Sequence, residues 1–378
     1  MPVKQRIFEL DALRGISLFG IILMNILVFS LPYEMASMSQ TVKGFNAVLL
    51  HLITLFVIGS FYPIFTFLFG YGLGMMFEHS RIRKVRFYPM IYRRLSFLLV
   101  IGVIHGMFIF SGDILFGYAF TGLFAVLFIK MKAQKLIKIA SILFVFKILI
   151  FVVPFAILNY TQGVYKKNNY LGISLQQFID VKQNGHYDSF LKLNVLENLY
   201  SMLDILMGSA FLEFLPYALF GIAAYKMNLI ELIRTKSSSF LKWGSLIAIL
   251  GYCIKMPFAI DYDNGSFAVI NAVGGPIVSA GYIILIVYLC QSVHGAQIMR
   301  IFKYPGKLSL SVYITQSIMF TFVFMGFGLG LYNKLPLYQS YLIVIIFYSL
   351  QVIGCYFYLK KFSKGPIEWL WRKVTYLK

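Results

Sequence analysis

The residues in this sequence best suited to chemistry are a histidine and an aspartate that flank a predicted turn. His105 lies near the end of an apolar segment, and Asp113 follows eight residues later, after Ser111 and Gly112. A Ser-Gly pair permits the chain to turn, so the carboxylate can return to the imidazole. A neighbouring aspartate raises the basicity of a histidine and fixes its tautomer, as general-base catalysis requires. We predict a catalytic His105–Asp113 pair. The alternative is a histidine with a purely structural role, which caps the end of a helix at the membrane interface.

Basic residues precede this pair along the chain. Arg94 comes eleven residues before His105, a distance of about 16 Å along a helix axis. Arg93, Arg94 and Arg14 are candidates to bind the phosphates of a nucleotide-bearing donor, because guanidinium groups match phosphate geometry. The alternative is that these cations set the membrane orientation of the chain and contact anionic lipids.

The elements that position these residues are predicted to be membrane helices. Hydrophobic residues make up 60% of the 378 residues and charged residues 13%, against about 45–50% and about 25% in soluble domains. This composition excludes an ordinary soluble globular protein. An apolar run at 46–59 is too short to cross a bilayer and suits a re-entrant or interfacial helix. Ten other segments are long and apolar enough to span, or nearly so: 15–32, 60–78, 91–110, 114–129, 138–159, 202–225, 242–260, 266–291, 308–331 and 338–360.

The net charge of +20 is distributed unevenly over these segments. With the N-terminus inside, the inside segments carry 26 Lys and Arg residues and the outside segments carry six. Basic residues collect on the cytoplasmic side of membrane proteins. We therefore predict an all-α polytopic membrane protein with about ten transmembrane helices, both termini cytoplasmic, and one transmembrane domain over 1–378. The positive charge then needs no nucleic-acid partner, and no spacing typical of a metal site is present.

Three ionisable residues of the apolar segments are further candidates. Lys147 and Glu213 lie in the middle of two predicted spans, and Asp204 lies nearer the outer surface. Ionisable groups inside a membrane are costly, so each is a functional candidate. The simplest account is that Lys147 and Glu213 pair; the alternative is a coupling-ion or proton site of a transporter. The polar stretch 160–201 is predicted to face outward, as a lid over a cavity or as a passive loop.

Several motifs resemble those of one bacterial family. They are Leu10-Asp11-Ala12-Leu13-Arg14-Gly15, the stretch from Phe65 to Gly72, Arg93-Arg94-Leu95 to His105, the stretch from Gly306 to Tyr313, and Gly365-Pro366-Ile367-Glu368-Trp369-Leu370-Trp371-Arg372. The chain resembles the YeiB-like bacterial membrane proteins, which carry the domain of unknown function 418. The resemblance covers nearly the whole chain, and 300–378 carries its C-terminal motifs.

The architecture of that family is similar to that of the transmembrane acyltransferases, many of which show an Arg, ten residues and then a His, as Arg94 and His105 do. The resemblance implies a multi-pass acyltransferase of the bacterial plasma membrane, surrounded by membrane lipids and without a tightly bound cofactor. Acyl-CoA would be the cytosolic donor, held by Arg14, Arg93 and Arg94. The acceptor would be a cell-surface glycan or lipid at the outer face.

Two other functions stay open at this point. One is a transporter or flippase for a lipid or small molecule, with Lys147, Asp204 and Glu213 as its working charges. The other is a membrane scaffold without turnover. A cavity that runs from Arg94 to His105 would favour the acyltransferase, and a closed pocket around Glu213 would favour the transporter.

Overall fold

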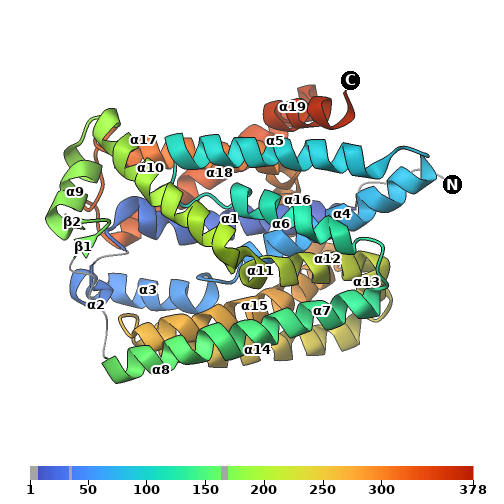
Figure 1. Cartoon of the computed structure of the whole chain (residues 1–378), viewed down its shortest axis with the longest axis horizontal. Coiled ribbons are helices and arrows are strands. Elements are labelled where there is room, and N and C mark those ends of the chain that lie inside the picture. The colour runs from blue at the N-terminus through green and yellow to red at the C-terminus, as the bar shows by residue number, and fades with distance from the viewer. Residues whose placement is uncertain (1–6, 34–35, 163–168, 378) are drawn as a thin grey trace.

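The computed structural model describes residues 7–33, 36–162 and 169–377, and these are almost entirely helical. Long helices run side by side along one axis, and short elements collect at the two ends of the bundle (Figure 1). A chain inside a membrane must satisfy its backbone polar groups without water, and helices do so within one segment. The fold is that of an all-α polytopic membrane protein, as predicted.

The elements alternate between long helices and short breaks. The first half contains α1 (Phe8–Ser30), α2 (Met38–Thr41), α3 (Phe45–Phe56), α4 (Tyr62–Ile82), α5 (Phe87–Phe108), α6 (Leu115–Ala125), the 3-10 turn η1 (Val126–Phe128), α7 (Ala133–Phe146), the π-helical turn η2 (Lys147–Val152) and α8 (Val153–Gln162). A two-stranded antiparallel hairpin follows, with Asn169 opposite Ser174: β1 (Asn169–Tyr170) and β2 (Ile173–Ser174).

The second half contains the remaining helices: α9 (Leu175–Asn184), α10 (Tyr187–Asp204), the π-helical turn η3 (Ile205–Ser209), α11 (Ala210–Glu213), α12 (Leu215–Lys226), α13 (Leu229–Thr235), α14 (Ser237–Ile260), α15 (Gly265–Leu289), α16 (Val293–Lys307), α17 (Ser309–Phe324), α18 (Leu337–Lys361) and α19 (Pro366–Tyr376).

Seven helices of the described chain are long and apolar enough to cross a membrane, or eight if α16 and α17, which are bent by 79°, count as one span. Six of the predicted spans overlap such helices directly: 15–32, 91–110, 138–159, 242–260, 266–291 and 338–360. Predicted span 308–331 corresponds to α17, and 60–78 to α4. Predicted span 114–129 is the shorter apolar helix Leu115–Phe128.

The prediction of one span over 202–225 is wrong. The candidate span here runs from Tyr187 to Glu213 and comprises α10, η3 and α11 with a kink at Gly208, and α12 begins only after a break at Phe214. Gly208 has a φ of 119°, which glycine adopts without the steric cost of a side chain. Pro216 lies in the first turn of α12, where its missing N–H breaks no helical hydrogen bond.

The polar stretch 160–201 is therefore largely helical, in α9 and α10, rather than a loop; its residues 163–168 lie outside the described chain. Asn194, Glu197 and Asn198 of α10 are buried in the bundle. Their polarity gave this stretch the appearance of a loop, because hydropathy does not distinguish a buried polar face from an exposed one.

A buried lysine forms hydrogen bonds with the non-helical residues between α3 and α4. The predicted short helix at 46–59 is present as α3, and five non-helical residues separate it from α4, which continues towards the other end of the bundle (Figure 1). Lys255 of α14 is 0% exposed, and its Nζ donates to the Ile58 carbonyl oxygen at 2.7 Å and to Ser60 Oγ at 2.9 Å. Ser279 Oγ donates to the Ser60 carbonyl oxygen at 2.5 Å. Backbone that leaves a helix inside a membrane requires partners of this kind.

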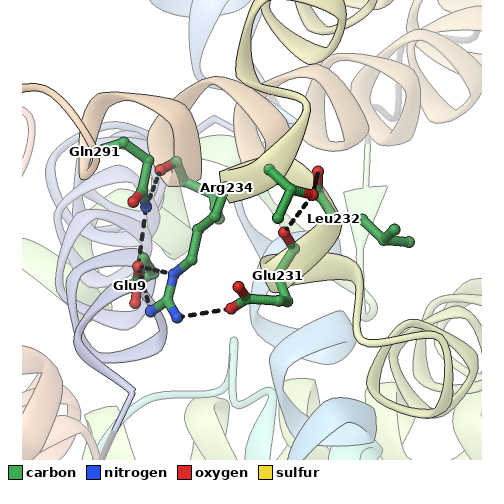
Figure 2. Close-up of polar contacts among 7 residues, drawn as sticks. Glu9, Glu231, Leu232, Arg234 and Gln291 are labelled. Carbon is green, nitrogen blue, oxygen red and sulfur yellow. Dashed lines mark hydrogen bonds and ion pairs between the residues drawn. The ribbon is translucent and has the colours of Figure 1, made fainter.

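The bundle has a basic end, which we define by the loops 83–86 and 129–132, by α13 with its flanking residues 227–228 and 236, and by α19. Helix α9 and the β1–β2 hairpin lie at the opposite end (Figure 1). A clamp at the basic end joins α1, α13 and the turn between α15 and α16 (Figure 2). Glu9 Oε1 accepts hydrogen bonds from Arg234 Nε at 3.0 Å, Arg234 Nη2 at 2.7 Å and Gln291 Nε2 at 3.0 Å. Burial alone would lower the pKa of Arg234, but its hydrogen bonds and charge contacts with Glu9 and Glu231 raise it above the usual value.

Replacing Arg234 with glutamine leaves the Glu9 carboxylate, which is only 3% exposed, without its cationic partner. We expect the free energy of unfolding to fall by about 1–3 kcal/mol, because a buried charge then loses its strongest hydrogen bonds. Thermal unfolding in detergent measures this loss. Glu231→Gln removes only the exposed partner of the same arginine and should change stability by less than about 0.5 kcal/mol. If the two variants lost equal free energy of unfolding, the stabilising role of the Glu9–Arg234 contact would be contradicted.

The orientation can be tested with single cysteines in a chain whose Cys253, Cys290 and Cys355 are replaced by serine. A membrane-impermeant maleimide should label Gln176→Cys, in α9, in intact cells. It should label Arg83→Cys, between α4 and α5, only after permeabilisation, because basic loops stay in the cytoplasm. The reverse pattern would show that the basic end faces outward.

Candidate active site

The predicted approach of Asp113 to His105 is present in the structure. His105 lies in the last turn of α5, and the chain turns back over residues 109–114 before α6 begins. His105 Nδ1 and Asp113 Oδ1 are 2.8 Å apart, and both side chains are buried. Asp113 Oδ2 accepts a hydrogen bond of 2.8 Å from the Phe116 N–H, so the same carboxylate caps the first turn of α6.

This contact assigns the two nitrogens of the imidazole. An ionised carboxylate can only accept, so Nδ1 carries the proton and Nε2 carries the lone pair. His105 Nε2 is buried and has no hydrogen-bond partner among the described residues. The pair thus presents a base whose remaining nitrogen is available to a bound molecule.

Helix α10 holds the turn between these two residues. Asn194 Nδ2 donates to the carbonyl oxygens of Gly106 and Met107, at 2.8 Å each, and Asn194 Oδ1 accepts from the Ser111 N–H at 2.8 Å. One amide side chain thereby satisfies backbone groups at the end of α5 and in the turn. The turn cannot shift without losing buried hydrogen bonds, so α10 fixes the distance between imidazole and carboxylate.

A buried ion pair closes the bundle next to this turn. Ser111 Oγ donates to Glu197 Oε2 at 2.9 Å, and Lys182 of α9 donates to both oxygens of Glu197 at 3.2 and 3.3 Å. We call α9 and α10 the cover. The sequence analysis missed these residues, although Asn194, Glu197 and Asn198 recur at the spacing of one helical face and could have been recognised as a polar stripe.

A cavity of about 310 Å³ lies between the basic end and the His105–Asp113 pair. Its basic part includes two of the three predicted arginines, Arg14 and Arg94. Three more cations and one carboxylate from the C-terminal part of the chain also line it: Lys307, Lys364, Arg372 and Glu368. Its deeper wall is mainly apolar and aromatic, with Leu18, Ile21, Phe65, Leu98, Leu115, Tyr118 and Tyr313.

Tyr313 connects this cavity to the imidazole. His105 itself is not among the lining residues, but its ring centroid lies 5.0 Å from that of Tyr313, which does line the cavity. The base is therefore one aromatic ring away from the cavity. Neither the cavity nor this contact can be inferred from local sequence, because Tyr313 lies more than 200 residues further along the chain.

Helix α19 holds Arg94 in place. The guanidinium of Arg94 stacks on the ring of Trp371 at 3.5 Å, and Trp371 Nε1 donates to the Arg94 carbonyl oxygen at 2.8 Å. A stacked guanidinium keeps its hydrogen-bonding edge available. Arg14 contacts Asp11 at 3.3 Å, as the spacing of three residues permits.

Arg93 does not join the other two arginines. Its Nε and Nη2 donate to the Thr375 carbonyl oxygen at 3.3 and 3.1 Å, and it lines a separate groove between α5 and α19. Consecutive residues on a helix point about 100° apart. Arg93 therefore anchors the end of α19, and only Arg94 turns towards the cavity.

The charges considered for transport lie outside this cavity. Lys147 and Glu213 form an ion pair, as the simplest account predicts, and Tyr62 donates its hydroxyl hydrogen to Glu213. Lys147 Nζ also donates to the Ala272 carbonyl oxygen at 3.3 Å. Asp204 lies on the exposed side of α10 and is not brought to this pair.

Comparison with known proteins finds a family model and three relatives that are similar to this chain. A family model described as "Protein of unknown function (DUF418)" matches residues 224–378. The chain is 29% identical to the uncharacterized protein YxaH of Bacillus subtilis (strain 168) over 391 residues, which cover 99% of this chain and 95% of YxaH.

Two further relatives are similar over nearly their whole lengths. An uncharacterized 39.9 kDa protein in the amylase 3' region of Bacillus acidopullulyticus is 27% identical, covering 100% of this chain and 95% of that protein. The uncharacterized protein YeiB of Escherichia coli (strain K12) is 23% identical, covering 98% of this chain and 96% of YeiB. The C-terminal part of this chain thus matches the DUF418 family model, and nearly the whole chain is similar to YxaH and YeiB.

Proposed function

We propose that this protein is an integral membrane acyltransferase that moves an acyl group from acyl-CoA to an acceptor at the opposite membrane face. One observation carries the proposal: a cavity with a basic mouth ends at an aromatic ring that lies against a buried histidine base. In this proposal the basic end faces the cytoplasm of a bacterial plasma membrane, where acyl-CoA is available, in keeping with the bias of basic residues.

The charges at the basic end of the cavity suit the phosphates of coenzyme A. Five cations and one carboxylate are among the described residues that line it. The carboxylate, Glu368, already accepts hydrogen bonds from the backbone of Leu310 and Ser311, so the cations keep a net attraction for an anion. Charge-assisted hydrogen bonds to phosphate are among the stronger ones in proteins. Among these cations Arg94 is the best placed to bind a phosphate, because its stacking on Trp371 limits the rotamers of its side chain.

The deeper cavity and the His105–Asp113 pair suit the acyl group and its transfer. Apolar side chains such as Leu18, Ile21 and Leu98 would contact the acyl chain. His105 Nε2 would take the proton of an acceptor hydroxyl or amine as that group attacks the thioester carbonyl. Asp113 would keep the proton of the imidazole on Nδ1 throughout. The carbon–sulfur bond then breaks, and the coenzyme A thiolate leaves with the proton from His105.

The acceptor is proposed to be a hydroxyl or amine of a cell-surface glycan or lipid. In this proposal it approaches from the end of the bundle that the cover closes through Lys182 and Glu197. A transporter is supported less well. Glu213 is held by Lys147 and Tyr62 and is not among the residues that line the cavity.

Donor binding is tested by comparing two adjacent arginines. Arg94→Ala should weaken the binding of acetyl-CoA to the purified protein by about tenfold or more, because charge-assisted hydrogen bonds to phosphate are lost. Arg93→Ala should weaken it by less than about threefold, since Arg93 bonds to Thr375 outside the cavity. Isothermal titration calorimetry in detergent measures both. Equal effects in the two variants would count against this donor site, and no binding by the unaltered protein would refute it.

Catalysis is tested at His105. His105→Ala should lower the transfer of a radiolabelled acetyl group from acetyl-CoA to membrane lipids or to hydroxylamine by at least about 100-fold, the usual effect of removing a general base. Acetyl-CoA affinity and thermal stability should be nearly unchanged. His294→Ala, an exposed histidine of α16, serves as the control. Transfer by His105→Ala at the level of this control would rule out the proposed base.

A further inference from the structure

Tyr313 occupies a position that the proposed reaction does not yet use. It lies one turn into α17, its side chain is only 3% exposed, and it lines the cavity while its ring packs against His105. The two rings are tilted by 43°. An acyl group that reaches the imidazole through this cavity must therefore pass the Tyr313 side chain.

The hydroxyl hydrogen of Tyr313 has no acceptor. The Ile114 backbone N–H interacts with the hydroxyl oxygen, but the hydroxyl is buried and no acceptor for its hydrogen lies among the described residues, where His105 Nε2 likewise has no partner. Neighbouring tyrosines differ, because Tyr118 donates to the Tyr62 carbonyl oxygen at 3.2 Å and Tyr348 to the Gly15 carbonyl oxygen at 2.7 Å. A buried hydroxyl without a partner destabilises the folded state. A phenylalanine would give the same packing without that cost. The Tyr313 hydroxyl differs from other buried hydroxyls without an acceptor, such as that of Tyr341, because Tyr313 lines the cavity and packs against His105, and this position points to a bound partner.

We propose that the Tyr313 hydroxyl donates a hydrogen bond to the carbonyl oxygen of the acyl group during transfer, which makes Tyr313 a catalytic residue. This rests on the proposed acyltransferase function. The two unsatisfied atoms have complementary roles, since His105 Nε2 accepts a proton and the tyrosine hydroxyl donates a hydrogen bond. Attack on a thioester needs both, because a proton leaves the nucleophile while negative charge develops on the carbonyl oxygen.

The step balances without a further reactant. The acceptor oxygen or nitrogen bonds to the carbonyl carbon as His105 Nε2 takes its proton, and the carbonyl oxygen becomes an oxyanion that accepts the Tyr313 hydrogen bond. When the carbonyl double bond re-forms, the carbon–sulfur bond breaks. The coenzyme A thiolate leaves and takes the proton from His105, while Tyr313 keeps its own proton throughout.

The base of α17 is built to hold Tyr313 still. Glu368 of α19 accepts hydrogen bonds from the Leu310 N–H at 2.8 Å and the Ser311 N–H at 3.0 Å, and Ser311 Oγ donates to the same carboxylate at 2.5 Å. These residues precede Tyr313 by only two or three positions. Donors that stabilise an oxyanion act through fixed orientation, and α19 supplies it here.

The experiment compares Tyr313→Phe with Tyr341→Phe in the full-length protein. Tyr341 is a matched control, because its side chain is 4% exposed, its hydroxyl hydrogen also has no acceptor among the described residues, and it packs in a different core cluster. Tyr313→Phe should lower kcat for acetyl transfer by about 100-fold or more, the effect of removing one oxyanion donor. The Kd for acetyl-CoA should stay within threefold, and Tyr341→Phe should leave kcat unchanged. A kcat of Tyr313→Phe within threefold of the unaltered protein overturns the proposal.

A second variant covers the case in which Tyr313→Phe does not fold. Fluorinated tyrosine at position 313 keeps the shape of the side chain but loses its proton at a lower pH. The alkaline limb of the kcat profile should then move to lower pH, and an unmoved limb overturns the proposal. The acyltransferase proposal and the Tyr313 proposal can be told apart when they fail. If the unaltered protein neither binds acetyl-CoA nor transfers its acetyl group, both proposals are refuted. If the unaltered protein transfers the acetyl group, His105→Ala does not, and Tyr313→Phe still does, only the role of Tyr313 is refuted.

Discussion

Backbone that leaves a helix inside a membrane must find its hydrogen bonds within the protein, and much of this structure follows from that constraint. Lys255 satisfies the break between α3 and α4. Asp113 and Asn194 satisfy the break between α5 and α6. The second break carries the candidate active site, because the carboxylate that caps α6 is also the one that orients His105. Structural and chemical roles are therefore combined in one side chain.

Pairing accounts for most of the buried charges. Glu9 with Arg234, Lys147 with Glu213 and Lys182 with Glu197 each join elements that are separate along the chain. A charge buried without such a partner would cost several kcal/mol. Once these pairs are formed, Glu9 Oε2 and His105 Nε2 both stay without a hydrogen-bond partner among the described residues, but the other oxygen of Glu9 binds Arg234, whereas His105 packs against Tyr313 of the cavity. That difference separates a candidate reactive group from the charges that hold the bundle together.

The site could be predicted where its parts are close in sequence and could not be predicted where they are distant. The Ser-Gly turn between His105 and Asp113 is local, so their contact followed from spacing. Arg93 and Arg94 are equally basic and adjacent, and only the direction in which each points on α5 separates an anchor of α19 from a residue of the cavity. Tyr313 ends one of the motifs that resemble the family, but its contact with His105 could not be predicted, since that contact depends on the packing of α17 against α5.

The sequence by itself determined that this is an all-α membrane protein with a basic end, because apolar length and charge distribution are properties of single segments. It also located most of the long helices. Only the tertiary structure decided that 202–225 is broken at Phe214, that the polar stretch before it is the cover, and that the cavity ends at Tyr313, whose ring packs against the imidazole. Those features depend on which polar groups meet across packed helices, and hydropathy contains no information about such partners.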